Sequence, residues 1–321
     1  MTEDLIPEED LVVTFSHEGY AKAQSMNTYK SQRRGGRGKT AATTKQQDFV
    51  EKIFVANSHE TLLCFSNLGK VFWLKVYQLP QGSRTARGKP LVNLLPLTDD
   101  EKITAVLPVK EFDGSNYVVM ATAKGLIKKT GLANFSRPRP SGIIAVGLSE
   151  DDYLIGAILT EGENEIMLVS SRGKAVKFNE NNVRAMGRSA RGVRGILLED
   201  TARTIALLTV GSEQQVLLVT ENGYGKRTSY DDFPIRSRGG KGVIAIQTTN
   251  RNGSVVGAAP VSEDDEVMLI TNQGMLVRQS VKGISIIGRN TQGIRLQKFD
   301  SGSEKHLINS YPNDFCFNYV V

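Results

Sequence analysis

Short apolar runs recur along the chain, and each is followed by two or three mostly polar residues and then a glycine. After that glycine comes a second short run, which usually carries a basic residue. Two strand-sized runs joined by a tight turn, with glycine where positive φ is needed, predict a β-hairpin. Six such segments occur, at residues 12–19, 62–69, 118–125, 166–173, 216–223 and 267–274.

The glycines that end these segments are spaced by 50, 56, 48, 50 and 51 residues. A second glycine follows each of them, 19 residues later in five repeats and 17 residues later in the third. No segment keeps a helical apolar period over three turns. A period near 50 residues with strand-only units indicates a propeller-like ring or a solenoid. The second glycines are Gly38, Gly88, Gly142, Gly192, Gly242 and Gly293.

Each repeat offers two more strands, one after the second glycine and one after the next turn. We therefore expect an all-β fold of six four-stranded repeats. Closing the ring protects the blade edges, and neither end shows a polar capping repeat, so a closed or nearly closed six-bladed disc is favoured over an open solenoid. The expected organisation is an acidic N-terminal linker at 1–10, a ring at 11–310 and a tail at 311–321, with repeats at about 11–58, 59–110, 115–161, 163–211, 213–262 and 264–310.

Composition narrows the class of protein. The 321 residues are 40% hydrophobic and 23% charged, which is typical of a globular domain. The apolar runs are far shorter than the ~18 residues of a membrane helix, and the acidic N-terminus is unlike a secretory signal. Two cysteines and three histidines supply neither a disulfide framework nor a four-ligand zinc site, so we expect a cytoplasmic protein without a metal.

The positive charge follows the repeat. The first ten residues hold five acids and no base, which leaves 40 basic and 29 acidic residues, or +11, in the rest of the chain. Basic residues recur four and one positions before the second glycine, and on the strand after the first. Equivalent positions of a ring share a face and a radius, so we expect a belt that binds a polyanion. The candidate rim residues are Lys22, Arg84, Arg87, Lys89, Lys128, Lys129, Arg137, Arg139, Lys177, Arg188, Arg191, Lys226, Arg227, Arg238, Lys241, Arg278 and Arg289.

The densest basic segment lies in the first repeat. Its glycines leave backbone N–H groups bare beside three arginines, a combination that suits phosphate. Gly38-Lys39-Thr40 matches the end of a nucleotide-binding P-loop, but Arg33 replaces the first glycine and no βαβ context exists, so nucleotide binding is disfavoured. A flexible Arg-Gly linker is the alternative. The segment consists of Gln32, Arg33, Arg34, Gly35, Gly36, Arg37, Gly38 and Lys39.

This octapeptide closely resembles the gyrase-A box, the motif of the C-terminal domain of the DNA gyrase A protein, with Arg37 where lysine is more usual. The resemblance implies a six-bladed β-pinwheel whose rim binds, bends and wraps duplex DNA without sequence preference. It implies a role in an ATP-driven type II topoisomerase that introduces negative supercoils. It extends over the chain, through residues 11–22, 72–80, 92–97, 183–187, 222–228 and 284–293.

The same resemblance implies partners and absences. The partners would be the N-terminal region of gyrase A and the gyrase B protein, in an A2B2 holoenzyme associated with the bacterial nucleoid. ATP and Mg²⁺ would bind other regions, so this domain is expected to hold no catalytic residue and no cofactor, and no tyrosine here follows the Arg-Tyr-Thr pattern of the cleavage site. Many members end in an acidic tail, whereas residues 310–321 are aromatic with one acid, which puts regulation by such a tail in doubt.

Two alternatives stay open. One is the homologous C-terminal domain of topoisomerase IV, which has a similar disc but lacks an intact box. The other is a protein-interaction propeller, although the repeat signatures of those families are absent and the chain has a single tryptophan, Trp73. Salt-dependent binding of DNA would separate DNA wrapping from protein interaction.

Overall fold

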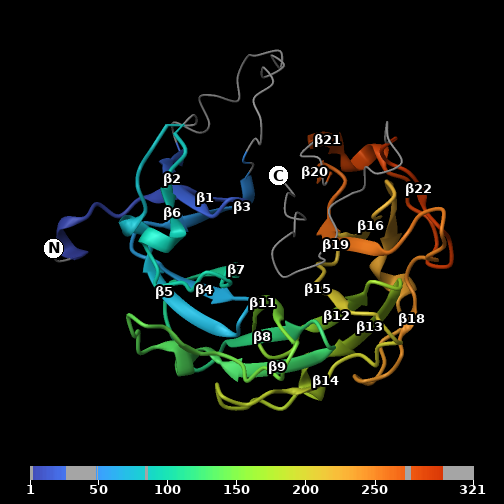
Figure 1. The fold of residues 1–321 in the computed structure, drawn as a ribbon, viewed down its shortest axis with the longest axis horizontal. Helices are drawn as coiled ribbons and strands as arrows, with labels where there is room; N and C mark the ends of the chain where they lie inside the picture. Colours follow the sequence, from blue (N-terminus) through green and yellow to red (C-terminus); the bar gives the residue numbers. More distant parts are fainter. Residues whose placement is uncertain (1–2, 27–47, 49, 84–85, 272–275, 299–321) are drawn as a thin grey trace.

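The computed structural model describes residues 3–26, 48, 50–83, 86–271 and 276–298, in which β-sheets are arranged around a common centre (Figure 1). Strands named next to each other are hydrogen-bonded within their sheet. The first three sheets are β3 (Val50–Asn57), β1 (Asp10–Ser16), β2 (Tyr20–Ser25), β6 (Lys89–Pro90); β10 (Ile143–Ile144), β5 (Lys70–Lys75), β4 (Thr61–Ser66), β7 (Ile103–Val109); and β11 (Leu154–Thr160), β8 (Tyr117–Thr122), β9 (Leu126–Gly131), β14 (Val193–Arg194). The other three are β15 (Thr204–Leu208), β12 (Glu165–Ser170), β13 (Lys174–Asn179), β18 (Val243–Ile244); β19 (Val255–Val261), β16 (Gln215–Thr220), β17 (Tyr224–Ser229), β22 (Ile294–Arg295); and β20 (Glu266–Ile270), β21 (Leu276–Ser280).

Apart from Met26, the helical residues that the structure describes lie in short 3₁₀ turns. Most of them directly follow the second strand of a hairpin and turn the chain toward the next repeat. They are η1 (Glu3–Leu5), η2 (Val76–Gln78), η3 (Leu91–Asn93), η4 (Leu132–Phe135), η5 (Glu180–Asn182), η6 (Tyr230–Asp232) and η7 (Val281–Gly283). Within this part of the chain, none of the helices has the length and apolar character needed to cross a membrane.

The all-β, propeller-like ring is confirmed, but the expectation of six four-stranded blades is not met. The described residues form five four-stranded sheets and one two-stranded sheet, β20–β21. The reason lies in the strands that a sixth full blade would need. The last expected repeat ends at about 310, so its fourth strand would fall outside the described residues, as does the segment after Gly38, the first-repeat equivalent of the outer strands.

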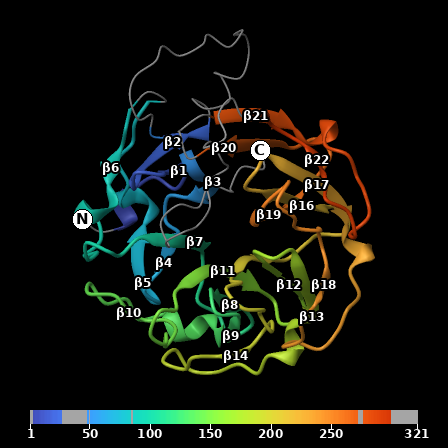
Figure 2. The same cartoon turned by 45° about the vertical axis from the view of Figure 1, so that its right-hand side comes forward.

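The outer strand of each four-stranded sheet comes from the following repeat. The two-residue strand after the second glycine does not stay with its own repeat: β14, for example, pairs with β9, so that Val193 lies opposite Ile127. The inner strands β7, β11, β15 and β19 face the centre, while β14, β18 and β22 lie on the periphery (Figures 1 and 2). Each of the first five repeats is therefore joined to the next by backbone hydrogen bonds, and the loops before the outer strands lie at the outside of the ring.

The hydrophobic core lies between neighbouring sheets. Leu218 packs in one cluster with Met167 of β12, whereas the adjacent Leu217 packs in another with Val267 of β20, and both leucines are fully buried. Each central strand is thus covered on both faces, which explains why the apolar runs are continuous rather than alternating.

The second glycine of a repeat occupies a contact that excludes a side chain. Gly192 has φ +93°, and a Cβ there would lie 2.5 Å from the backbone oxygen of Ile127, two residues after the first glycine of the preceding repeat. Gly88, Gly242 and Gly293 make the same approach to the preceding sheet. The paired glycines therefore mark the hairpin turn and the point where the next repeat crosses the strand behind it.

Candidate nucleic-acid interface

Several exposed basic residues lie on the loops before the outer strands. Six of the predicted rim residues are exposed at these loops: Arg87, Lys89, Arg137, Arg139, Arg191 and Lys241. They belong to four successive repeats. Lys89 directly follows the second glycine of its repeat, and the others lie in the loop before that glycine. These loops precede β6, β10, β14 and β18, which lie on the outside of the ring (Figure 2), so an extended polyanion can reach exposed bases of several repeats.

Among the described residues, the arginines four positions before the second glycine are half-buried. Arg238 donates from Nε to the backbone oxygen of Asn182 at 2.8 Å and from Nη1 to that of Arg194 at 3.0 Å. Arg289 donates from Nη1 to the backbone oxygen of Ile244 at 2.8 Å. Arg188 is also half-buried. Arg238 and Arg289 thus tie a loop to the preceding repeat with part of the guanidinium and leave the rest at the surface.

For five of the predicted rim residues, the expectation of an exposed position is wrong. Lys128, Lys129, Lys177, Lys226 and Arg227 are all buried, with at most 6% of their surface exposed. These residues follow the first glycine on β9, β13 and β17, the second strand of a sheet that is packed on both faces. The basic residues that recur on these strands therefore make internal contacts and do not form a surface charge.

Two of these lysines hold backbone oxygens. Lys128 Nζ donates to Ala145 O at 2.6 Å and to Arg188 O, and Lys226 Nζ donates to Gly288 O at 2.8 Å and Arg289 O at 2.6 Å. Burial lowers the pKa of Lys128 to about 7, with Arg188 adding repulsion. Burial likewise lowers the pKa of Lys226 to about 8, with a contribution from Arg289.

The other three buried bases are held by acids, aromatic rings or polar groups. Lys129 Nζ lies 3.7 Å from Glu180 and over the ring of Tyr117. Lys177 Nζ lies 3.4 Å from Glu165 and 3.8 Å from the ring centre of Tyr230. Arg227 donates from Nε to the backbone oxygen of Ile284 at 2.7 Å and from Nη1 to Gln215 at 3.2 Å. None of these groups is placed to reach an external phosphate.

The remaining predicted residues fall into three cases. Lys22 is half-buried and donates to the backbone oxygens of Ser83 and Ala86, at 3.1 and 2.8 Å. Arg278 is exposed but paired with Glu266, and the exposed Arg87 is paired with Glu18. Arg84 and the octapeptide Gln32 to Lys39 lie outside the described residues.

Several exposed arginines were not among the residues predicted from the sequence. Arg194 and Arg295 each stand two positions after a second glycine, in β14 and β22, a shared register that the glycine spacing contains. Arg295 and Arg251 both donate to the hydroxyl of Tyr224, at 2.7 and 3.1 Å, so that two guanidinium groups converge on one point. Arg184 and Arg236 are exposed without a common register.

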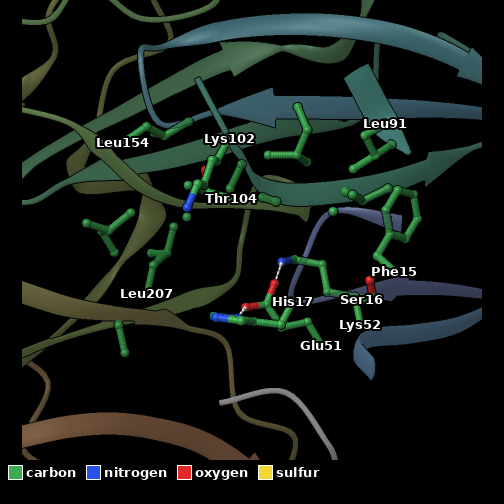
Figure 3. A pocket seen from close by; sticks show the side chains of 18 of the residues that line it. Phe15, Ser16, His17, Glu51, Lys52, Leu91, Lys102, Thr104, Leu154 and Leu207 are labelled. Atoms are coloured by element: carbon green, nitrogen blue, oxygen red, sulfur yellow. Dashed lines mark hydrogen bonds and ion pairs between the residues drawn. The ribbon is translucent and has the colours of Figure 1, made fainter. Parts of the chain in front are cut away.

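A cavity of about 960 Å³ lies at the centre of the ring and is lined by residues from all six sheets, from Phe15 to Val267. Figure 3 shows its polar side, where His17 contacts Glu51 at 2.9 Å and Lys52 lies 3.5 Å from the same carboxylate. Most of the remaining lining is aliphatic. Within the described residues, no group of three or more His, Cys, Asp or Glu side chains could hold a metal ion. The cavity lining includes Lys52 and Lys102 but none of the predicted rim residues.

The sequence profile described as "DNA gyrase C-terminal domain, beta-propeller" matches residues 10–57, 60–110, 116–161, 164–210, 214–262 and 265–305. The chain belongs to this family. The resemblance stated from the octapeptide and the repeats is thereby confirmed, and the matched segments cover six successive repeats.

Relatives and solved structures agree with this membership. The chain is similar to the DNA gyrase A protein of Salmonella typhimurium, 55% identical over 92% of this chain and 34% of that protein. It is 53% identical to gyrase A of Escherichia coli K12 over the same shares, and 50% identical to that of Haemophilus influenzae over 95% of this chain and 38% of the relative. The chain therefore spans about a third of the length of these relatives.

Two solved structures share the fold. A DNA gyrase A C-terminal domain superposes with a TM-score of 0.73 and 28% identity, covering 93% of this chain and 98% of that one. The C-terminal domain of DNA topoisomerase IV superposes with a TM-score of 0.80 and 24% identity, covering 96% of both chains. At that identity the topoisomerase IV likeness concerns the fold alone, whereas the sequence relatives above carry the gyrase name.

Proposed function

We propose that this domain binds duplex DNA without sequence preference and wraps it around its periphery, as the C-terminal part of a gyrase A protein. The observation that carries the proposal is the row of exposed bases on the peripheral loops of successive repeats, in a chain that belongs to the gyrase C-terminal domain family. Spaced Arg and Lys side chains neutralise phosphates and release counterions, which gives affinity without base specificity.

The energy of bending favours many contacts over one. Half a turn of DNA at an axis radius of roughly 35 Å costs on the order of 13 kcal/mol by the smooth elastic estimate. A charge-assisted hydrogen bond contributes about 1.5–3 kcal/mol. One loop with two bases cannot offset the bend, but loops from four or more repeats can. Arg87, Arg139, Arg191 and Lys241 are exposed on the peripheral loops of four successive repeats, which supports that requirement.

Within this proposal the domain itself is not an enzyme and holds no cofactor. DNA cleavage, ATP and Mg²⁺ belong to other regions of a type II topoisomerase, which uses the wrap to introduce negative supercoils. The partners are the N-terminal region of gyrase A and the gyrase B protein in an A2B2 holoenzyme, in the bacterial cytoplasm at the nucleoid. The family membership and the gyrase names of relatives that are about three times longer support this part of the proposal.

The test measures both binding and bending by the domain. A duplex of mixed sequence carrying a fluorophore at each end is titrated with protein from 50 to 200 mM salt. We expect a log–log slope of several units and energy transfer that rises with binding. A variant with Arg137, Arg139, Arg191 and Lys241 changed to Ala should lose both signals, whereas changing the exposed Lys102 and Lys110 should not. Binding that is independent of salt, or specific for one sequence, would contradict the proposal.

A further inference from the structure

Lysine and apolar residues alternate at one position of the repeat. Three residues after the first glycine, the first, third and fifth repeats carry a lysine, whereas the second, fourth and sixth carry Phe or Val. The residues in order are Lys22, Phe72, Lys128, Val176, Lys226 and Val277. The strands β2, β5, β9, β13, β17 and β21 that hold them are otherwise equivalent. Packing of the strand therefore does not require a lysine, because alternate sheets form without one.

In the three sheets that have the lysine, its amine binds the same loop. This is the loop that leads to the outer strand of that sheet. Lys22 Nζ donates to the oxygens of Ser83 and Ala86, before β6. Lys128 Nζ donates to Arg188 O, before β14, and Lys226 Nζ donates to Gly288 O and Arg289 O, before β22. In the two intermediate four-stranded sheets, Phe72 and Val176 instead pack close to Gly142 and Gly242.

The hydrogen-bond partners of Lys128 and Lys226 are neutral oxygens. Ala145 O completes the set around Lys128, and the Thr291 hydroxyl lies 3.0 Å from Lys226 Nζ. Moving a charged amine out of water without a carboxylate partner costs free energy, so an apolar side chain would fill this space at a lower free-energy cost. What the amine supplies is a fixed direction for carbonyl oxygens of the peripheral loop, which are Arg188 O for Lys128 and Gly288 O and Arg289 O for Lys226. On the loops held in this way, Arg87 and Arg191 are exposed, while Arg188 and Arg289 are half-buried.

We propose that Lys22, Lys128 and Lys226 are positioning residues that hold alternate peripheral loops in their DNA-binding conformation before DNA arrives. This proposal rests on the proposed function, since it explains how that interface is prepared. The arginines on the loops held by these lysines are Arg87 in the first sheet, Arg188 and Arg191 in the third, and Arg289 in the fifth. A loop that is already ordered loses less conformational entropy on binding, so each contact contributes more to affinity.

The test changes the amine and follows the loop and DNA separately. Lys226→Met and Lys128→Met keep the length of the side chain and remove its donors. Without DNA, we expect Lys226→Met to speed amide exchange in residues 287–293 and leave 236–242 unchanged. Lys128→Met should do the same for 186–192. Each variant should bind DNA about tenfold more weakly than the wild type, because the freed loop must be ordered on binding. The charge-matched control is Lys110→Met, at an exposed lysine after β7, which should change neither loop.

The outcomes separate three possibilities. Unchanged exchange in both Met variants overturns the proposal, and so does unchanged DNA affinity. Weaker DNA binding with unchanged loop exchange would show a direct phosphate contact by the lysine instead. If one Met variant fails to fold, the other tests the proposal by itself, because Lys128 and Lys226 bind different loops. Failure of the wild-type domain to bind DNA would remove the proposed function, while the exchange data would still report whether the amine holds the loop.

Discussion

Lys226 Nζ lies 2.6 Å from the backbone oxygen of Arg289, although the two residues stand in different repeats. Arg289 in turn donates from its side chain to Ile244 O, at the outer edge of the preceding sheet. A buried amine, a peripheral loop and the neighbouring sheet are thus linked through one residue. The peripheral loops are parts of the ring's own connections, and changes inside the ring should affect the surface that faces DNA.

Stability should depend on pH through Lys128. The pKa of Lys128 is lowered to about 7 by burial and by Arg188, from an ordinary value of 10.5. Between these two values the unfolded chain binds more protons at this site than the folded one, so the free energy of unfolding should rise with pH from 7 toward 10. Urea unfolding at pH 7.0, 8.0 and 9.0 measures this, and Lys128→Met should flatten the rise. Equal slopes in both proteins would show that Lys128 is not buried in solution.

Gly192 closely approaches the preceding sheet, whereas Gly187 of the same loop does not, so these two glycines allow a matched pair of substitutions. Gly192→Ala places a methyl group 2.5 Å from Ile127 O at positive φ, and should destabilise the domain by about 3 kcal/mol. Gly187→Ala lies in the same loop with no atom within 4 Å of the added methyl group, and should change stability by less than about 0.5 kcal/mol. Urea unfolding of both variants checks the difference, and similar losses would contradict this strand crossing.

The Glu18 carboxylate should compete with DNA for Arg87, with which it pairs at the surface. Replacing it by an amide frees the guanidinium and removes one negative charge. We therefore expect Glu18→Gln to raise DNA affinity about two- to threefold at low salt and less at high salt. The control is Glu161→Gln, at an exposed glutamate after β11. A gain of equal size in the control would mean that net charge alone is responsible.

The spacing of glycines was sufficient to predict the ring, the hairpins and the loops that carry the bases. It could not show that the strand after the second glycine pairs with the preceding sheet, because Val193 and Ile127 become neighbours only through the fold. It also could not separate exposed from buried bases. Basic residues recur with similar regularity at the positions of Lys128 and Arg191. Lys128 is buried beneath a peripheral loop, whereas Arg191 is exposed on that loop. Burial depends on which sheet covers the position, and that information is absent from a single repeat.

The octapeptide Gln32 to Lys39 remains a prediction from the sequence, since it lies outside the described residues. Changing Arg33, Arg34 and Arg37 to Ala should impair bending more than binding. Arg137, Arg139, Arg191 and Lys241 stay in place on the other repeats, so DNA should still be captured. Bending is the costly step, and three lost phosphate contacts at about 1.5–3 kcal/mol each can abolish the last part of a wrap.

In a whole gyrase the same triple change should abolish negative supercoiling while relaxation and decatenation persist. The contrast arises because supercoiling needs the wrapped segment, whereas strand passage does not. End-to-end fluorescence transfer beside a binding titration measures the effect on the isolated domain. A triple Ala variant at Arg137, Arg139 and Arg191 removes the same charge elsewhere on the periphery and should reduce binding and bending together. If the octapeptide variant does the same, the segment is one stretch of a uniform belt and has no special part in wrapping.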